Sequence, residues 1–170
     1  MGEIFEALDP LSPLQFFSIS HPIFYVKKGF ADLKSSKYIL NDLNFLNDQE
    51  IFAEFRIGWN EQALLLKVEI HKPFEEAFYP DSQKGDSLEI FIDTRNLKNA
   101  GFFHKFCHHF LFLPQEVAGI QAQEISKFRS EDAHPLCDSE ELLLSVEKGK
   151  KYYQMSIEIS TKALHGADPL

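Results

Sequence analysis

The stretch GDSLEIFID, residues 85–93, has an aliphatic side chain at every second position from Leu88 to Ile92. Leu88, Ile90 and Ile92 fall on one side of an extended chain and Glu89, Phe91 and Asp93 on the other, because successive side chains of a strand point to opposite faces. The stretch therefore predicts a half-buried β-strand whose three aliphatic residues face a core.

The same period of two recurs in pairs of segments separated by a polar turn. Such pairs predict antiparallel hairpins. Two are present, formed by residues 51–59 with 63–70 and by residues 142–147 with 152–160.

Shorter strand patterns complete the chain, at residues 23–26, 104–113 (ending at Pro114) and 117–125. Several short strands with polar turns and no sustained helical period favour an all-β fold. We predict an antiparallel β-sandwich with jelly-roll or immunoglobulin-like layering.

The first 22 residues contain Pro10, Pro13 and Pro22. Prolines at this spacing disfavour a helix, so residues 1–22 are predicted to be an irregular N-terminal arm. Residues 23–170 have the length of one domain and are predicted to form a single β-sandwich.

The 170 residues include 17 Phe and one Trp, a composition that excludes a disordered chain. We expect most of the phenylalanines to fill the space between the two sheets. The net charge of −9 leaves no basic face for nucleic acid or an anionic membrane, so neither partner is expected.

Two cysteines are too few for a disulfide scaffold. Residues 1–6 have neither the basic nor the apolar region of a secretory signal peptide, and no apolar run is long enough to span a membrane. We therefore expect a cytoplasmic protein.

The order of these segments resembles the family 9 carbohydrate-binding modules and the related DOMON-like sandwiches. The resemblance covers roughly residues 52–164 and is carried by WNEQALLLKV (59–68), GDSLEIFIDTR (85–95), MSIEIS (155–160) and Ala163-Leu164. It implies a β-sandwich that binds a glycan without catalysis, in the service of carbohydrate catabolism or as an accessory domain of a carbohydrate-active enzyme.

Two departures from this family are visible. Its members clamp a sugar between aromatic rings, commonly those of tryptophan, whereas the single tryptophan here, Trp59, lies in the first hairpin, where a structural place is expected. The family fold also usually adds a strand after the Ala-Leu pair, and this sequence stops at Leu170, so we expect that strand to be missing.

A glycan site requires an exposed aromatic ring beside hydrogen-bonding groups. The loop after the first hairpin holds aromatic residues among acidic ones, and charged residues of the motif follow it. The predicted ligand-binding residues are Phe74, Phe78, Tyr79, Asp86, Glu89, Asp93 and Arg95. The alternative is that the phenylalanines plug the ends of the sandwich and the carboxylates bond to turn backbone.

The acidic residues of the motif do not predict a glycosidase. Glu89 and Asp93 are four residues apart, which places their Cα atoms roughly 13 Å apart on a strand, whereas a catalytic pair needs carboxyls roughly 5–10 Å apart. Their oxygens could instead bind calcium at the strand end. The chain has no Walker pattern, nucleophile elbow or His-Glu-x-x-His, so no catalytic activity is predicted.

The pattern His-x2-Cys occurs twice, at residues 104–107 and 134–137. Tetrahedral zinc is commonly bound by two such pairs. On a strand the first His and Cys would face opposite sides, so the predicted zinc ligands are Cys107, His109, His134 and Cys137. The alternative is that adjacent His108 and His109 straddle the strand, one of them partly buried and hydrogen-bonded.

The sequence thus favours a non-catalytic, carbohydrate-binding β-sandwich. Two alternatives stay open: a zinc protein that uses the Cys/His set, and a protein-interaction sandwich that has lost sugar binding.

Overall fold

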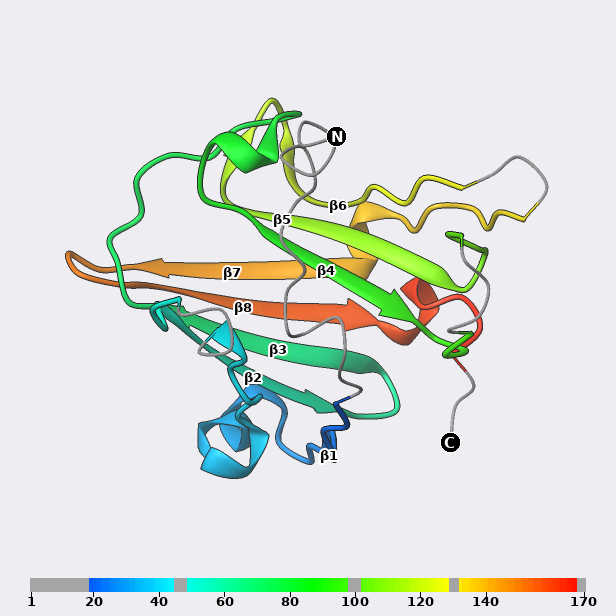
Figure 1. The fold of residues 1–170 in the computed structure, drawn as a ribbon, viewed down its shortest axis with the longest axis horizontal. Coiled ribbons are helices and arrows are strands. Elements are labelled where there is room, and N and C mark those ends of the chain that lie inside the picture. Colours follow the sequence, from blue (N-terminus) through cyan, green and yellow to red (C-terminus); the bar gives the residue numbers. More distant parts are fainter. Residues whose placement is uncertain (1–18, 45–48, 98–101, 129–131, 168–170) are drawn as a thin grey trace, which may run out of the picture.

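The computed structural model describes residues 19–44, 49–97, 102–128 and 132–167, which form two β-sheets packed face to face (Figure 1). In chain order the elements are β1 (Phe24–Tyr25), the 3-10 turns η2 (Gly29–Lys34) and η3 (Ser36–Tyr38), β2 (Ala53–Trp59), β3 (Ala63–Ile70), η5 (Ser82–Lys84), β4 (Leu88–Asp93), β5 (Cys107–Val117), β6 (Ile120–Glu124), η6 (Ser139–Glu141), β7 (Leu142–Lys148), β8 (Tyr153–Ser160) and η7 (Thr161–Ala163). Most of the predicted N-terminal arm, residues 1–18, lies outside the described residues.

The larger sheet has the strand order β1-β2-β3-β8-β7 and the smaller sheet the order β4-β5-β6. This confirms the predicted β-sandwich, with one difference. The short β1 pairs in parallel with β2, through Phe24 with Gly58 and Tyr25 with Trp59, whereas the other pairings are antiparallel. A parallel pair needs a long crossover, which the segment carrying η2 and η3 supplies.

The core between the sheets comes from the alternating residues of facing strands. The buried side chains of β3 and β8 point inward against those of β5, and the set includes Leu66, Val68, Ile70, Phe110, Phe112, Met155, Ile157 and Ile159. Leu88, Ile90 and Ile92 of the motif pack on this core as predicted.

The core is mainly aliphatic, contrary to the expectation that most phenylalanines fill it. Among the described residues, Phe110 and Phe112 are the only buried phenylalanines. They lie on β5, the central strand of the smaller sheet, and are covered from both sides. Others, such as Phe52 and Phe91, are exposed to solvent.

Strand β5 differs from the prediction at both ends. It begins at Cys107, because His104 accepts a turn hydrogen bond from the Cys107 amide (2.8 Å). It continues past Pro114 to Val117, because a register shift between Phe112 and Val117 accommodates a residue that cannot donate to the ladder. The hairpin turn therefore falls at residues 118–119, both with positive φ.

The crossover that carries η2 and η3 covers the outer face of the larger sheet. Val26, Leu33 and Tyr38 form a second apolar cluster there with Ala63 and Leu65. No helix of the described residues is long and apolar enough to cross a lipid bilayer.

Candidate functional site

The Gly-Asp-Ser start of the motif is a packing junction. A Cβ atom on Gly85 would lie 2.7 Å from the Phe78 ring and closer still to the Glu76 carbonyl oxygen. Asp86, which is 8% exposed, accepts hydrogen bonds from the Lys72 ammonium and from the backbone amide of Glu75 (3.1 Å). Glycine at 85 and aspartate at 86 thus hold the loop of residues 72–78 against the start of β4.

Two cavities flank this junction. One, of about 490 Å³, is lined mainly by polar side chains, those of Lys72, Glu75, Glu76, Phe78, Gln83, Lys84 and Asp86 together with Gly85. The other, of about 290 Å³, lies between the sheets and is mainly apolar, with the exposed Phe52 among its lining residues. Of the predicted ligand-binding residues, the structure brings Phe78 and Asp86 together in the first cavity.

Phe74 and Tyr79 pack into the fold. The Phe74 ring makes an edge contact with Tyr153 (centroids 5.9 Å apart), and the Lys148 ammonium lies 3.6 Å from its centroid. The Tyr79 hydroxyl donates to Gln123 (3.1 Å). This arrangement corresponds to the alternative in which loop aromatics plug the end of the sandwich.

The three remaining predicted residues lie on or just after β4. Glu89 accepts from the Ser82 hydroxyl (2.8 Å) and pairs with His109 (2.8 Å), and mainly the Ser82 bond lowers the pKa of this carboxyl. Asp93 accepts from the backbone amides of Arg95 (3.0 Å) and Leu97 (2.7 Å). Both carboxylates are engaged within the protein: Glu89 joins β4 to Ser82 and to His109 of β5, and Asp93 stabilises the turn that follows β4.

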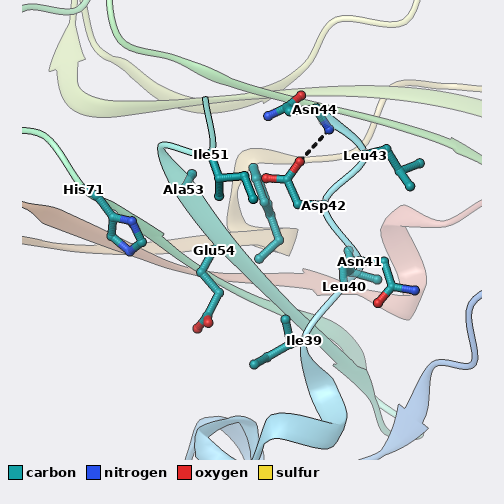
Figure 2. A pocket seen from close by; sticks show the side chains of 11 residues that line it. Ile39, Leu40, Asn41, Asp42, Leu43, Asn44, Ile51, Ala53, Glu54 and His71 are labelled. Atoms are coloured by element: carbon teal, nitrogen blue, oxygen red, sulfur yellow. Dashed lines mark hydrogen bonds between the residues drawn. The ribbon is translucent and has the colours of Figure 1, made fainter. Parts of the chain in front are cut away.

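A third cavity, of about 510 Å³, lies beside β2 and is bordered by the 39–44 segment (Figure 2). The Asp42 carboxylate accepts from the Asn44 amide (2.7 Å), and Glu54 and His71 lie on the opposite side of the view from Asn41. This cavity has fewer charged lining residues than the one beside Gly85.

Trp59 has the structural place predicted for it. Its ring makes an edge contact with Tyr25 (centroids 5.2 Å apart), and its indole N–H donates to the Ile23 carbonyl (3.1 Å). The tryptophan thereby fastens β1 to the larger sheet.

The four predicted zinc ligands do not converge on one point, although His134 and the backbone amide of Cys137 both contact Glu124. His109 pairs with Glu89, Cys107 lies against His104, and the backbone amide of Cys137 donates to Glu124 (2.9 Å). Among the described residues, potential metal-ligand atoms come within 4.8 Å of one another in two groups of three, neither of which holds more than one of the predicted four. These groups are Asp93 with His104 and Cys107, and His108 with Glu124 and His134.

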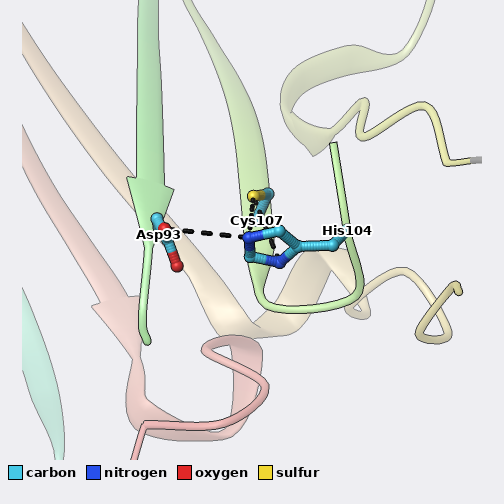
Figure 3. A group of neighbouring side chains, drawn as sticks. All are labelled: Asp93, His104 and Cys107. Carbon is cyan, nitrogen blue, oxygen red and sulfur yellow. Dashed lines mark hydrogen bonds and ion pairs between the residues drawn. The ribbon is translucent and has the colours of Figure 1, made fainter. Parts of the chain in front are cut away.

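The first group lies where β4 ends and β5 begins (Figure 3). The Cys107 sulfur is 3.4 Å from both ring nitrogens of His104, and His104 Nε2 is 3.8 Å from Asp93. A sulfur at equal distance from both nitrogens lies along neither lone pair, and Asp93 already accepts two backbone amides. The group therefore packs a thiol on an imidazole and lacks convergent ligand directions.

The second group lies on the inner face of the smaller sheet, the face that also carries Phe110 and Phe112. Glu124 Oε1 lies 3.0 Å from His108 Nδ1 and 2.9 Å from His134 Nε2, and it accepts from the Ser126 hydroxyl (2.8 Å). The side chains of His108 and Glu124 are 0% exposed and that of His134 is 2% exposed. His108 is thus buried and bonded, as the alternative expected, while His109 lies on the opposite face, where its side chain is 18% exposed and pairs with Glu89.

Neither Glu124 nor His108 is among the predicted zinc ligands, and of this group only His134 is. Burial alone raises the pKa of a carboxyl, but the hydrogen bonds that Glu124 makes with His108, the Cys137 amide, Ser126 and His134 outweigh it and lower the pKa to about 2. The side chain is therefore an ionised carboxylate at neutral pH. The sequence signal that could have identified Glu124 is an acidic residue at an inward-facing position of a strand.

Cys137 is expected to react slowly with alkylating agents. Burial, followed by the Glu124 charge, raises the pKa of its thiol from 9.0 to about 12. The reactive thiolate at pH 8 is then on the order of 100- to 1,000-fold scarcer than in an ordinary thiol. Mass spectrometry of iodoacetamide-treated protein, with glutathione as the reference thiol, measures this rate; alkylation of Cys137 as fast as glutathione would contradict the prediction.

Comparison with known proteins identifies the family. Residues 29–165 match the model of the carbohydrate family 9 binding domain-like family. Two similar solved structures are of a carbohydrate binding module family 9 (CBM9) from Caldicellulosiruptor kristjanssonii, in complex with cellotriose and with glucose; each is 18% identical with a TM-score of 0.48, and the match covers 64% of this chain and 48% and 49% of the respective structures. The chain thus spans about half the length of those structures, and a search of curated proteins gave no match. Because the family model covers most of its length, this chain belongs to the carbohydrate family 9 binding domain-like family.

Proposed function

We propose that this domain binds a glycan without converting it, in the polar cavity beside Gly85 and Asp86. Membership of the family supports the class of ligand. The observation that carries the site is the convergence of carboxylates, ammonium groups and an amide around the half-buried Phe78 ring in a space of about 490 Å³. This volume lies within the roughly 300–1,000 Å³ of typical small-molecule sites.

The lining matches the chemistry of a sugar. Hydroxyl groups donate to the carboxylates of Glu75 and Glu76 and accept from the ammonium groups of Lys72 and Lys84. Hydrogen bonds in which one partner is charged are about twice as strong as neutral ones. The C–H face of a pyranose ring packs on Phe78, and the fixed Lys72–Asp86 pair keeps the floor of the cavity in place.

Calorimetry with cellotriose and glucose, the sugars named for the two similar structures, tests this proposal. Wild-type protein is expected to bind one of them. Glu76→Gln and Phe78→Ala are each expected to weaken that binding roughly tenfold, which corresponds to about 1.4 kcal/mol. Circular dichroism establishes that each variant remains folded.

Phe91→Ala is the matched control. Its ring is 64% exposed and stacks on His109 on the outer face of the smaller sheet, away from the cavity lining. Unchanged affinity is expected. Loss of binding in Phe91→Ala with full binding in the two cavity variants would place the sugar on that outer face and overturn the assigned cavity. No binding of any oligosaccharide at millimolar concentration would contradict the function itself.

A further inference from the structure

The four ring nitrogens of His108 and His134 all face oxygen atoms. His108 Nδ1 lies 3.0 Å from Glu124 Oε1 and its Nε2 lies 3.2 Å from the His165 carbonyl oxygen. His134 Nε2 lies 2.9 Å from the same Glu124 oxygen, and its Nδ1 lies 2.5 Å from the Lys105 carbonyl oxygen. Backbone carbonyls and an ionised carboxylate only accept hydrogen bonds.

A neutral imidazole has one N–H and one lone pair. If each ring donates its N–H outward to a carbonyl, the lone pairs of His108 Nδ1 and His134 Nε2 both point at the lone pairs of Glu124 Oε1. In that arrangement all three atoms are acceptors, so protons or a metal cation must lie between them. Two further protons, one on each ring, would satisfy the geometry, and so would one divalent cation.

We propose that His108 Nδ1, Glu124 Oε1 and His134 Nε2 bind one divalent transition-metal ion, and that this ion is zinc. Two imidazoles with one carboxylate are an established zinc donor set. Ligands about 2.1 Å from a tetrahedral zinc are about 3.4 Å apart, so the present separations of 2.9 and 3.0 Å need to widen by about half an ångström. The Ser126 hydroxyl donates to Oε1 (2.8 Å) and accepts from the His109 amide (2.9 Å), so it holds the carboxylate in place.

The surroundings of the two rings are those of metal-binding histidines. Such histidines typically donate their second N–H to a carbonyl or carboxylate, which fixes the tautomer and the ring orientation. Here the carbonyls of Lys105 and His165 occupy these positions. The His108 ring stacks on Phe110 and the His134 ring packs on Phe128, so both ring planes are held before an ion arrives.

The site joins segments that are distant in the sequence. His108 belongs to β5, Glu124 ends β6, and His134 comes from the irregular segment that leads toward β7. The ligand atoms are buried, so the ion would have a structural role and would fasten this segment to the smaller sheet. This inference does not depend on the proposed sugar site.

Metal analysis of the full chain tests the proposal. Protein purified without chelator and then dialysed against zinc is expected to retain one equivalent after gel filtration, and EDTA is expected to lower its melting temperature. His108→Gln and His134→Gln should weaken zinc binding by more than the roughly 10–100-fold that loss of a supporting hydrogen-bond partner costs.

His109→Gln is the matched control, because this neighbouring histidine lies on the opposite face of the same strand and pairs with Glu89. It should retain the full equivalent, as should Cys107→Ser and Cys137→Ser. Should a ligand variant fail to fold, the spectrum of cobalt-loaded wild-type protein decides: a nitrogen and oxygen ligand field supports the site, and a thiolate-to-cobalt charge-transfer band overturns it. Less than a tenth of an equivalent of zinc would also overturn it.

Discussion

Glu124→Ala is expected to lower the free energy of unfolding by about 3–5 kcal/mol, as measured by urea denaturation with EDTA present. The carboxylate is fully buried, accepts from the Ser126 hydroxyl and the Cys137 amide, and lies 3.0 Å from His108 Nδ1 and 2.9 Å from His134 Nε2. Its removal leaves these four polar groups without a partner in an interior where they cannot reach water, and this desolvation cost dominates the loss.

Two further variants are needed to interpret the stability of Glu124→Ala, one conservative and one at an exposed position. Glu124→Gln keeps the shape but offers one accepting oxygen, so it should also destabilise, by less than the alanine variant. Glu116→Ala, at an exposed position on β5, should change stability by no more than about 0.5 kcal/mol. A Glu124→Ala protein as stable as wild type would show that the buried network contributes nothing to folding.

Asp86→Ala is expected to cost about 2–3 kcal/mol of stability and to weaken sugar binding. The buried carboxylate accepts from the Lys72 ammonium and the Glu75 amide. Because the Lys72 side chain is 43% exposed, water replaces part of what it loses, and the expected cost is below that for Glu124. Without this anchor, Glu75 and Glu76 no longer converge on the cavity.

Asp81→Ala serves as the control for this prediction. Asp81 pairs with Lys84 three residues later, but both side chains are more than 60% exposed. Exposed pairs contribute little, so urea denaturation should show a change of less than about 1 kcal/mol. Equal effects of the two aspartate variants would show that burial of Asp86 is not what makes it important.

The strands could be predicted because their signal is local. The alternation in residues 51–70 and 142–160 is set by neighbouring side chains, and the structure has both hairpins in register. The continuation of β5 past Pro114 could not be predicted, because the register shift that tolerates the proline depends on the partner strand. The prediction that most phenylalanines fill the core was wrong for the same reason, since burial depends on which strand lies at the centre of a sheet.

The buried cluster of His108, Glu124 and His134 could not be predicted, because no local sequence pattern shows which residues of different segments meet. The register that pairs Phe110 with Glu124 places the carboxylate on the inner face beside His108, and this pairing joins two strands across a turn. His134 reaches the same point from an irregular segment that has no period. The sequence singled out His134 but paired it with cysteines, because His-x2-Cys spacing suggests zinc more readily than a lone glutamate in a strand.

During synthesis, β8 emerges from the ribosome after the other four strands of the larger sheet. β8 lies between β3 and β7 and pairs Ala63 with Ser160, so β3 and β7 are not joined until residues 153–160 have emerged. Until then β3 has an unpaired edge, and such edges invite pairing with other chains. A nascent chain halted before residue 153 is therefore an aggregation-prone intermediate rather than a smaller stable sandwich.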